Sequence, residues 1–277
     1  MLQLGRFNTL YALRKATPGM FLGEIDSDED VLLPNKYVPA GLNPDDSIEV
    51  FLYTDSEDRI VATTRTPNIL LHQYSVLEVN DVTEFGAFLD WGLEKDLFLP
   101  FSGQKKRVEK GDRVTVFLYF DERTERLIAS ARFKDFIQHE ITVKEGEEVD
   151  LLVDRKSELG YQVIINNLHL GLLFSSEVFR PLCKGDRVKG FIKGIREDGK
   201  IDVSLQKQGY TQIADAQDQL LRKLRDNGGV LHLTDKSAPE EIARKLQMSK
   251  KAFKKSVGAL YKQRKIKIES DRIVLLI

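Results

Sequence analysis

The chain repeats itself, and this repeat limits the possible folds more than any other feature of the sequence. Residues 31–34 read VLLP and residues 97–100 read LFLP. The run SIEVFLYTDSEDRIVAT at 47–63 has a similar counterpart, RVTVFLYFDERTERLIAS, at 113–130. Self-similarity at a spacing of roughly 67 residues indicates tandem domains of one kind. We therefore expect two copies of one small domain, at residues 1–66 and 67–137.

The second copy, from Glu78 to Arg132, consists of short apolar runs separated by turns. This alternation predicts strands, and five such strands are typical of a small closed barrel of the oligonucleotide-binding (OB) kind. The FGAF run at 85–88, the short LFL strand, the GDRV strand entry and an apolar last strand before Arg132 resemble the S1 RNA-binding domain. The first copy lacks the FGAF run, so we expect a degenerate S1-like barrel there, serving mainly in packing.

A third copy is expected at residues 138–208. Gly160–Ile165 takes the place of the aromatic strand, and Gly171–Phe174 takes the place of the short third strand. Lys184-Gly185-Asp186-Arg187-Val188 repeats the GDRV entry, and Asp198-Gly199 predicts a hairpin turn into the last strand. The sequence therefore predicts three S1-like five-stranded barrels in a mostly β, multidomain chain.

The alternating pattern stops after Gly209, and helical periodicity follows to the C-terminus. One helix is expected at 213–226, a second after Ser237 as N-cap with Pro239 in its first turn, and a third at 250–264 capped by Ser249. Two short apolar runs, 266–268 and 273–276, predict a terminal hairpin. Together these elements resemble an α+β winged-helix domain at 209–277, in which the second helix of the helix-turn-helix faces nucleic acid.

Charge is distributed unevenly in a chain whose net charge is only −1. Between Lys236 and Lys267 there are eleven Lys and Arg residues against two acids, Glu240 and Glu241. A local basic excess indicates an anionic partner such as a phosphate backbone, although a solvated helix face explains the charges equally well.

The candidate RNA-binding residues of the second domain are aromatic and charged. Single strands bind by stacking bases on exposed aromatic rings within a positive groove. The S1 resemblance implies this role for Phe85 and Phe88, of which Phe88 is the stronger candidate; burial in the barrel core is the alternative. It also implies that Asp121 and Arg126 lie on the same face. Pro100 stands where S1 domains often have a His.

Further candidates lie in the third barrel and the winged helix. Tyr161, Phe174 and Lys200 occupy positions that we compare with the second domain, and Phe174 could equally be core. Lys251, Lys254 and Lys255 fall on one side of the expected recognition helix, opposite Phe253 and Val257, and are candidates for phosphate contacts.

The sequence offers little for catalysis. His72, His139, His169 and His232 have no metal-ligand spacing, and Cys183 is the single cysteine. No apolar run approaches the ~20 residues that span a membrane, and no signal-peptide pattern is present. We therefore expect a cytoplasmic chain without enzyme activity, cofactor, metal or membrane partner.

Three S1-like barrels followed by a winged helix resemble the bacterial conserved virulence factor B family. The resemblance implies an RNA-binding, post-transcriptional or other regulatory role without catalysis, with single-stranded RNA as partner and duplex nucleic acid a possible partner of the winged helix. Two alternatives remain: a DNA-binding transcription regulator acting through the winged helix, and a ribosome-associated translation factor. The oligomeric state is left open.

Overall fold

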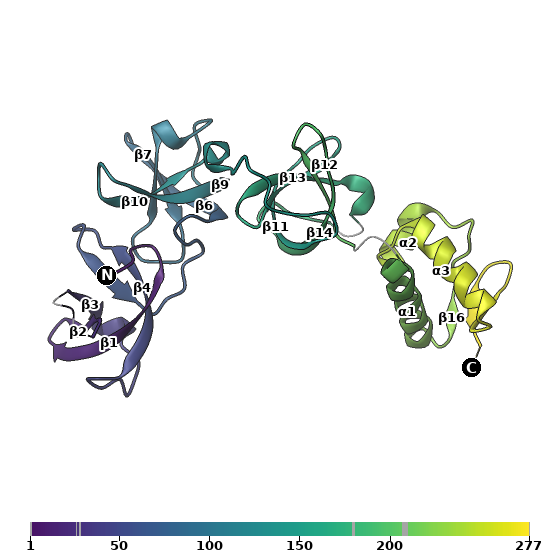
Figure 1. Cartoon of the computed structure of the whole chain (residues 1–277), viewed down its shortest axis with the longest axis horizontal. Coiled ribbons are helices and arrows are strands. Elements are labelled where there is room, and N and C mark those ends of the chain that lie inside the picture. Colours follow the sequence, from purple (N-terminus) through teal and green to yellow (C-terminus); the bar gives the residue numbers. More distant parts are fainter. Residues whose placement is uncertain (1, 26, 28, 179–180, 207–209, 277) are drawn as a thin grey trace. The chain divides into compact units, whose positions relative to one another are not determined.

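Five antiparallel and parallel strand pairings close the first domain into a barrel (Figure 1). The computed structural model describes residues 2–25, 27, 29–178, 181–206 and 210–276. The strands follow the order β1-β2-β3-β5-β4, with bounds β1 Phe7–Ala16, β2 Gly19–Gly23, β3 Asp30–Pro34, β4 Ser47–Thr54 and β5 Ile60–Thr63. A short 3-10 turn, η1 Asn35–Tyr37, follows β3.

The second domain repeats this order in a five-stranded sheet, β10-β9-β6-β7-β8. Its bounds are β6 Tyr74–Val82, β7 Gly86–Asp90, β8 Leu97–Pro100, β9 Arg113–Asp121 and β10 Arg126–Ser130. The ends of this sheet, β8 and β10, match β3 and β5, which the first barrel joins at a single parallel register position, Leu32 opposite Val61. The 3-10 turns η2 Phe101–Gly103 and η3 Phe133–Phe136 follow β8 and β10.

The third domain closes again, in the order β11-β12-β13-β15-β14. Its strands are β11 Glu148–Lys156, β12 Gly160–Ile165, β13 His169–Phe174, β14 Arg187–Ile195 and β15 Ile201–Ser204, with η4 Ser175–Glu177 after β13. The first strand of each of the three domains has a register shift in its second half, between Ala12 and Arg14, Val79 and Asp81, and Val153 and Arg155. One strand order is therefore used three times, as the repeat predicts, in two closed barrels and in one open sheet, the second domain, which we also call a barrel because its strands follow the same order.

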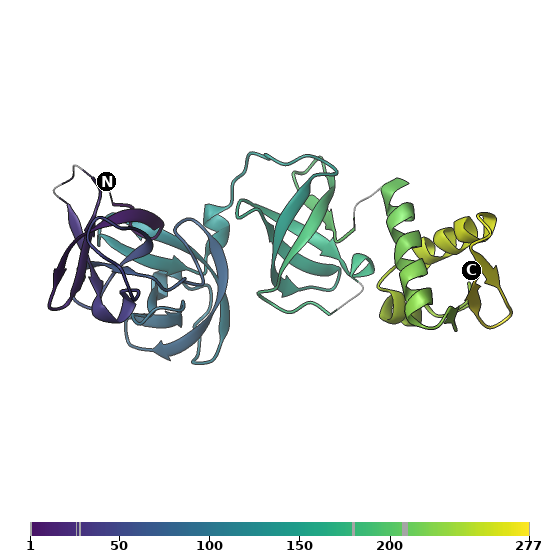
Figure 2. The ribbon, with the colours of Figure 1, turned by 90° about the horizontal axis from the view of Figure 1, so that it is seen from below.

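Helices and a small sheet make up the C-terminal domain, whose hairpin is yellow in Figure 2. The elements are α1 Tyr210–Asp226, β16 Val230–Leu231, α2 Pro239–Leu246, α3 Lys250–Lys262, β17 Ile266–Ile268 and β18 Ile273–Leu275. The sheet order is β16-β18-β17, so a third strand joins the predicted hairpin. The mostly β fold class with a C-terminal winged helix is confirmed.

Two details at the helix ends differ from the sequence prediction. Helix α2 has Ala238 as its N-cap, whereas the Ser237 hydroxyl accepts a hydrogen bond from the Thr234 backbone nitrogen at 2.9 Å. The prediction of Ser237 as the cap is therefore wrong, because its side chain closes the preceding turn. Ser249 caps α3 as expected, accepting from the Ala252 nitrogen at 3.1 Å, but α3 ends at Lys262 because Arg264 turns into the left-handed region.

The chain divides into two compact units, residues 1–137 and 138–277. Within the first unit the two barrels share apolar core: Phe51, Tyr53 and Val61 of the first pack in one buried cluster with Trp91 and Leu93 of the second. Trp91 meets the rings of Phe51 and Tyr53 edge-on at 5.8 and 6.2 Å. The expected boundary at residues 208 and 209 lies outside the described residues. Among the described helices, none is long and apolar enough to cross a bilayer.

Candidate nucleic-acid interface

A glycine stands at the start of the second strand of each barrel, at the same register position. Gly86 pairs with Pro100, and a Cβ on Gly86 would lie 2.6 Å from the Leu99 carbonyl oxygen. Gly19 and Gly160 make the same approach to their third strands, with corresponding distances of 2.0 and 2.1 Å. Because a side chain here would collide with backbone, these glycines allow the second and third strands to come close. They also define equivalent positions in the three domains.

From Gly86 onward, the side chains of β7 point alternately to the core and to the surface. Ala87 and Leu89 are fully buried, whereas Phe88 between them is half-buried and points outward. In β8 the same alternation buries Leu97 and Leu99 and turns Phe98 outward. Phe88 and Phe98 lie opposite each other in the ladder, and their ring centroids are 5.3 Å apart. The two strands thus display a pair of aromatic rings on one face.

Phe85 adds a third ring at the turn before β7. Its side chain is 70% exposed, the largest value among the exposed large apolar side chains of the described residues. The Thr83 hydroxyl accepts a hydrogen bond from the Phe85 nitrogen at 3.3 Å and donates to the Gly86 carbonyl at 3.3 Å, which fixes the turn. An exposed apolar ring held by a fixed turn is what base stacking requires.

These three rings line one cavity of about 360 Å³. Its floor is formed by buried residues of the second domain, Trp91, Leu97, Leu127 and Ile128. Thr54 comes from the first barrel, so both barrels of the unit contribute to the wall. Lys95, Asp96 and Arg126 supply the charges. A cavity with aromatic walls and cations at its edge suits a flipped-out base with its phosphate.

The two cations of the cavity contact an acid of the first barrel. The Lys95 ammonium lies 3.2 Å from Asp58 Oδ1, and Arg126 Nη2 forms an ion pair with Asp58 Oδ2. Lys95 also donates to the Asp55 carbonyl oxygen at 2.6 Å. The hydrogen bond from Arg126, followed by that from Lys95, lowers the pKa of Asp58.

Asp96 is the acid inside the cavity. Its Oδ1 accepts a hydrogen bond from the Asn80 amide at 3.0 Å. Burial raises the pKa of Asp96, against the Asn80 hydrogen bond, and the nearby charges of Asp90 and Asp81 raise it further.

Asp121 has a local role in the structure. Its Oδ2 accepts from the Thr124 hydroxyl at 2.8 Å, and this bond leads the contributions that lower the pKa of Asp121. The carboxylate therefore closes the β9–β10 turn, and it is not among the residues that line the cavity. Arg126, five residues later, lies at the cavity edge.

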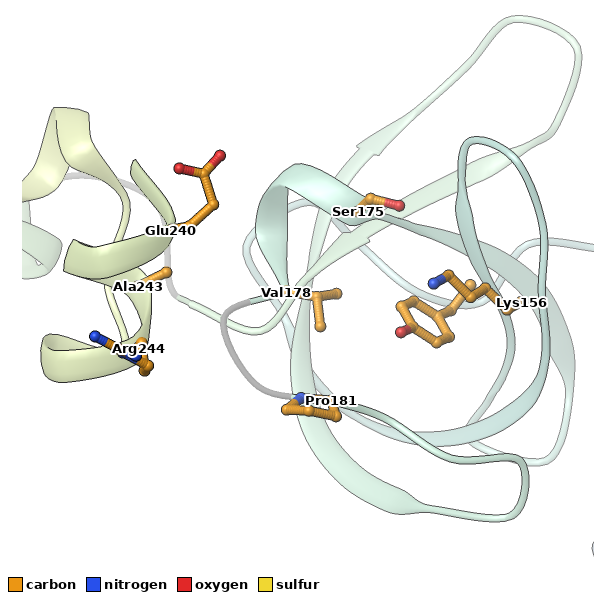
Figure 3. Close-up of a pocket in the computed structure, with 8 residues that line it drawn as sticks. Lys156, Ser175, Val178, Pro181, Glu240, Ala243 and Arg244 are labelled. Carbon is orange, nitrogen blue, oxygen red and sulfur yellow. The ribbon is translucent and has the colours of Figure 1, made fainter. Parts of the chain in front are cut away.

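In the third barrel Tyr161 faces the core, whereas the comparison with the second domain predicted a position on the RNA-binding face. Counting from Gly160, Tyr161 corresponds to Ala87, which faces the core, and Gln162 corresponds to Phe88. Tyr161 is accordingly only 9% exposed and belongs to the buried cluster of this barrel. Lys156, its ladder partner on β11, is exposed, as is Ser175 of the same barrel (Figure 3). This burial favours packing over stacking for Tyr161.

Phe174 keeps an outward, half-buried ring at the position that corresponds to Pro100. Lys193 Nζ and Arg196 Cζ each lie 5.8 Å from the centre of this ring. Lys200 is exposed, and its ammonium pairs with Asp198 of the same turn at 2.6 Å. Two cations therefore lie beside the Phe174 ring, whereas Lys200 forms an ion pair within its own hairpin.

Helix α3 presents the three predicted lysines together. Lys251, Lys254 and Lys255 are exposed, and Phe253 and Val257 on the other side are buried in the domain core. Its first turn contains no acid to offset the positive end of the helix dipole. Within the described part of the chain, no group of three or more His, Cys, Asp or Glu side chains is placed to hold a metal ion.

Sequence reasoning missed several cavity residues. Phe98 could have been found, because Leu97 and Leu99 flank it in a strand of strict alternation. Trp91, Lys95 and Asp96 lie in the loop between β7 and β8, where the sequence has no periodic pattern of apolar residues. Only the fold brings them beside Phe85. The Trp91 indole donates to the Lys95 carbonyl at 2.5 Å, which anchors this loop to the shared core.

Comparisons with known proteins agree with this architecture. The model of the S1 domain matches residues 4–65 and 73–132, and the model of the CvfB-like winged helix domain matches residues 218–275. The third barrel repeats the strand order of the two barrels that the S1 model matches. S1 and winged-helix domains indicate that the chain binds nucleic acid.

Relatives are similar over most of the chain. YitL of Bacillus subtilis is 29% identical over 259 residues, covering 90% of this chain and 85% of that protein. Conserved virulence factor B of Staphylococcus saprophyticus is 24% identical over 257 residues, covering 84% and 83%. A crystal structure of a multidomain protein with nucleic acid binding domains from Streptococcus pneumoniae aligns with 99% of this chain and 98% of that one, at 23% identity and a TM-score of 0.42. The resemblance drawn from the sequence is thus confirmed: the chain is a relative of the conserved virulence factor B proteins, with S1 domains and a CvfB-like winged helix domain.

Proposed function

We propose that this chain is a non-catalytic regulatory protein of the cytoplasm that holds single-stranded RNA on its S1 barrels. The second domain provides the principal site, and helix α3 of the winged helix adds phosphate contacts. The aromatic cavity is the observation that supports this most: Phe85, Phe88 and Phe98 line it together, with Lys95 and Arg126 at its edge.

The cavity favours a single strand over a duplex for a physical reason. Stacking on Phe85 or Phe88 requires a base that is free of its own stack, and a duplex offers such a base only after unpairing. The bases of a single strand can enter directly. The lysines of α3 add charge without selecting a sequence, because phosphate contacts position a strand and do not read bases.

The proposal predicts that Phe85→Ala weakens binding of a single-stranded RNA by about 1–3 kcal/mol, the value of one stacked base. Phe85 is 70% exposed, so the melting temperature should not change. Phe88→Ala should weaken binding similarly and also lower the melting temperature, because Phe88 packs against Phe98. Fluorescence titrations beside thermal melts of the full chain measure both effects.

Phe120→Ala is the matched control, since Phe120 is exposed on β9 of the same domain but does not line the cavity. It should leave RNA affinity unchanged. Equal losses of RNA affinity in Phe85→Ala and Phe120→Ala would show that the cavity is not part of the RNA-binding site. Tighter binding of duplex DNA than of single-stranded RNA of equal length would contradict the proposal as a whole.

The exposed lysines of α3 favour one second candidate, a DNA-binding regulator that acts through the winged helix. This candidate predicts a preference for duplex DNA and indifference to Phe85→Ala. The same titrations therefore distinguish the two functions.

A further inference from the structure

The cations beside the aromatic cavity already hold an anionic group, and it comes from the other barrel. Lys95 and Arg126 converge on the single carboxylate of Asp58, one on each oxygen. Asp58 lies in the turn between β4 and β5 of the first domain, 68 residues away from Arg126 in the sequence. A guanidinium and an ammonium that converge on one carboxylate are the groups that also bind a phosphate.

The three repeats show that this arrangement is particular to the second domain. Arg59, Arg126 and Lys200 each stand just before or at the start of the last strand of their barrel. Arg59 pairs with Asp55 in its own hairpin at 2.7 Å, and Lys200 pairs with Asp198 in its own hairpin at 2.6 Å. Arg126 instead reaches a partner on the neighbouring barrel, at the edge of the cavity.

The interaction is weak enough to be exchanged. The side chains of Arg126, Asp58 and Lys95 keep 53%, 41% and 33% of their surface exposed. Ion pairs in such solvated positions contribute little to stability, because water and salt screen them. Asp58 is held at this edge by the shared core beneath it, where Phe51 and Tyr53 of β4 pack on Trp91. The acid therefore stays close when its cations turn to another anion.

We propose that Lys95 and Arg126 form a phosphate subsite of the RNA-binding cavity, and that Asp58 of the first barrel is its built-in competitor. An RNA phosphate displaces the carboxylate as the neighbouring base stacks on the phenylalanines. Through Asp58, the degenerate first barrel thereby lowers the affinity of the second barrel for RNA. This inference rests on the proposed function and adds a regulatory role for the first barrel.

Asp58→Asn in the full chain tests the competition. Asp58 has a φ of +61°, a conformation that Asn tolerates well, so the turn should keep its shape. The variant should bind a single-stranded RNA oligonucleotide severalfold more tightly at low salt. The slope of log affinity against log salt should become steeper, by up to ~0.7, because in the wild type the displaced Asp58 carboxylate takes up a salt cation and offsets one that the RNA phosphate releases.

Glu57→Gln is the matched control, because it removes the same charge from the same turn, and Glu57 pairs with Arg59 of its own hairpin. It should leave both affinity and slope near the wild-type values. Equal increases of affinity in the two variants would mean that net charge alone is responsible and would overturn the competition. In an Arg126→Ala background, Asp58→Asn should no longer raise the affinity appreciably.

Unchanged or weaker binding by a folded Asp58→Asn chain, in a protein that binds RNA and loses affinity with Phe85→Ala, would overturn the inference and leave the proposed function intact. Asp58 would then position Arg126 rather than compete for it. Absence of RNA binding by the wild-type chain would overturn both.

Discussion

Asp96 shows how a single residue of the cavity is balanced between opposing effects. Its carboxylate is partly buried beside aromatic rings, and Asn80 is the amide that donates a hydrogen bond to it. Because burial raises the pKa of Asp96, the folded state favours the protonated acid. A group of this kind contributes stability at low pH, and that contribution is lost as the pH rises through the folded pKa.

We therefore predict that Asp96→Asn makes the protein more stable at pH 7 but not at pH 3. Above its raised folded pKa the wild-type chain must bury a charge that the variant lacks, whereas below the ordinary Asp pKa of about 3.9 both side chains are neutral in the folded and the unfolded chain. The Asn side chain can still accept the Asn80 hydrogen bond. Thermal melts of both proteins across this pH range measure the difference; a constant difference at all pH values would contradict the prediction.

At the scale of elements, helix α3 has positive side chains at the end where they oppose the helix dipole. Lys251 lies in the first turn, where a cation opposes the helix dipole, and no acid shares that turn. The buried side of the helix is secured by Phe253, Val257 and Leu260. Packing therefore tolerates the unfavourable charges, which an anion bound at this surface would offset.

Replacing Lys251, Lys254 and Lys255 together with Gln should weaken RNA binding at low salt. For every phosphate that the protein no longer neutralises, the slope of log affinity against log salt should flatten by ~0.7 for a single strand. The variant should melt no lower than the wild type, because the Gln side chains remove repulsion at the helix start. The same change at Arg222, Lys223 and Arg225, which are exposed on α1, is the control. An equal flattening of the slope in this control would show that the lysines act only through total charge.

At the scale of the whole molecule, residues 1–137 behave as one folded body made of two barrels. Trp91 lies at their junction, 3% exposed, and packs on aromatic rings of the first barrel while its indole anchors the loop of Lys95. The first barrel therefore supports the aromatic cavity as well as repeating the strand order of the second barrel.

Trp91→Ala should destabilise both barrels together, by roughly 3–5 kcal/mol for the loss of a buried aromatic side chain. Native-state hydrogen exchange of the full chain should show faster exchange in β4 and β5 as well as in β6–β10. The strands of the third barrel, in the other compact unit, serve as an internal reference and should not change. Faster exchange confined to β6–β10 would mean that the two barrels unfold independently.

The amino-acid sequence by itself determined most of the elements and their order; strand β16 and the N-cap of α2 are the exceptions. Period-two alternation buried Leu97 and Leu99, the repeat revealed the common plan of the barrels, and the Ser249 cap located the start of α3. These signals are local, since a strand or a helix end depends on residues a few positions apart. The exposed lysines of α3 and the outward Phe88 follow from the same periods.

The tertiary structure alone decided which of these residues meet. Tyr161 faces the core because β12 and β13 pair in the register that places Gly160 opposite Phe174, and a shift of one residue would turn every side chain to the other face. Asp58 reaches Arg126 only because two barrels share a core around Trp91. Contacts between residues far apart in the sequence depend on packing and register, which no local pattern encodes.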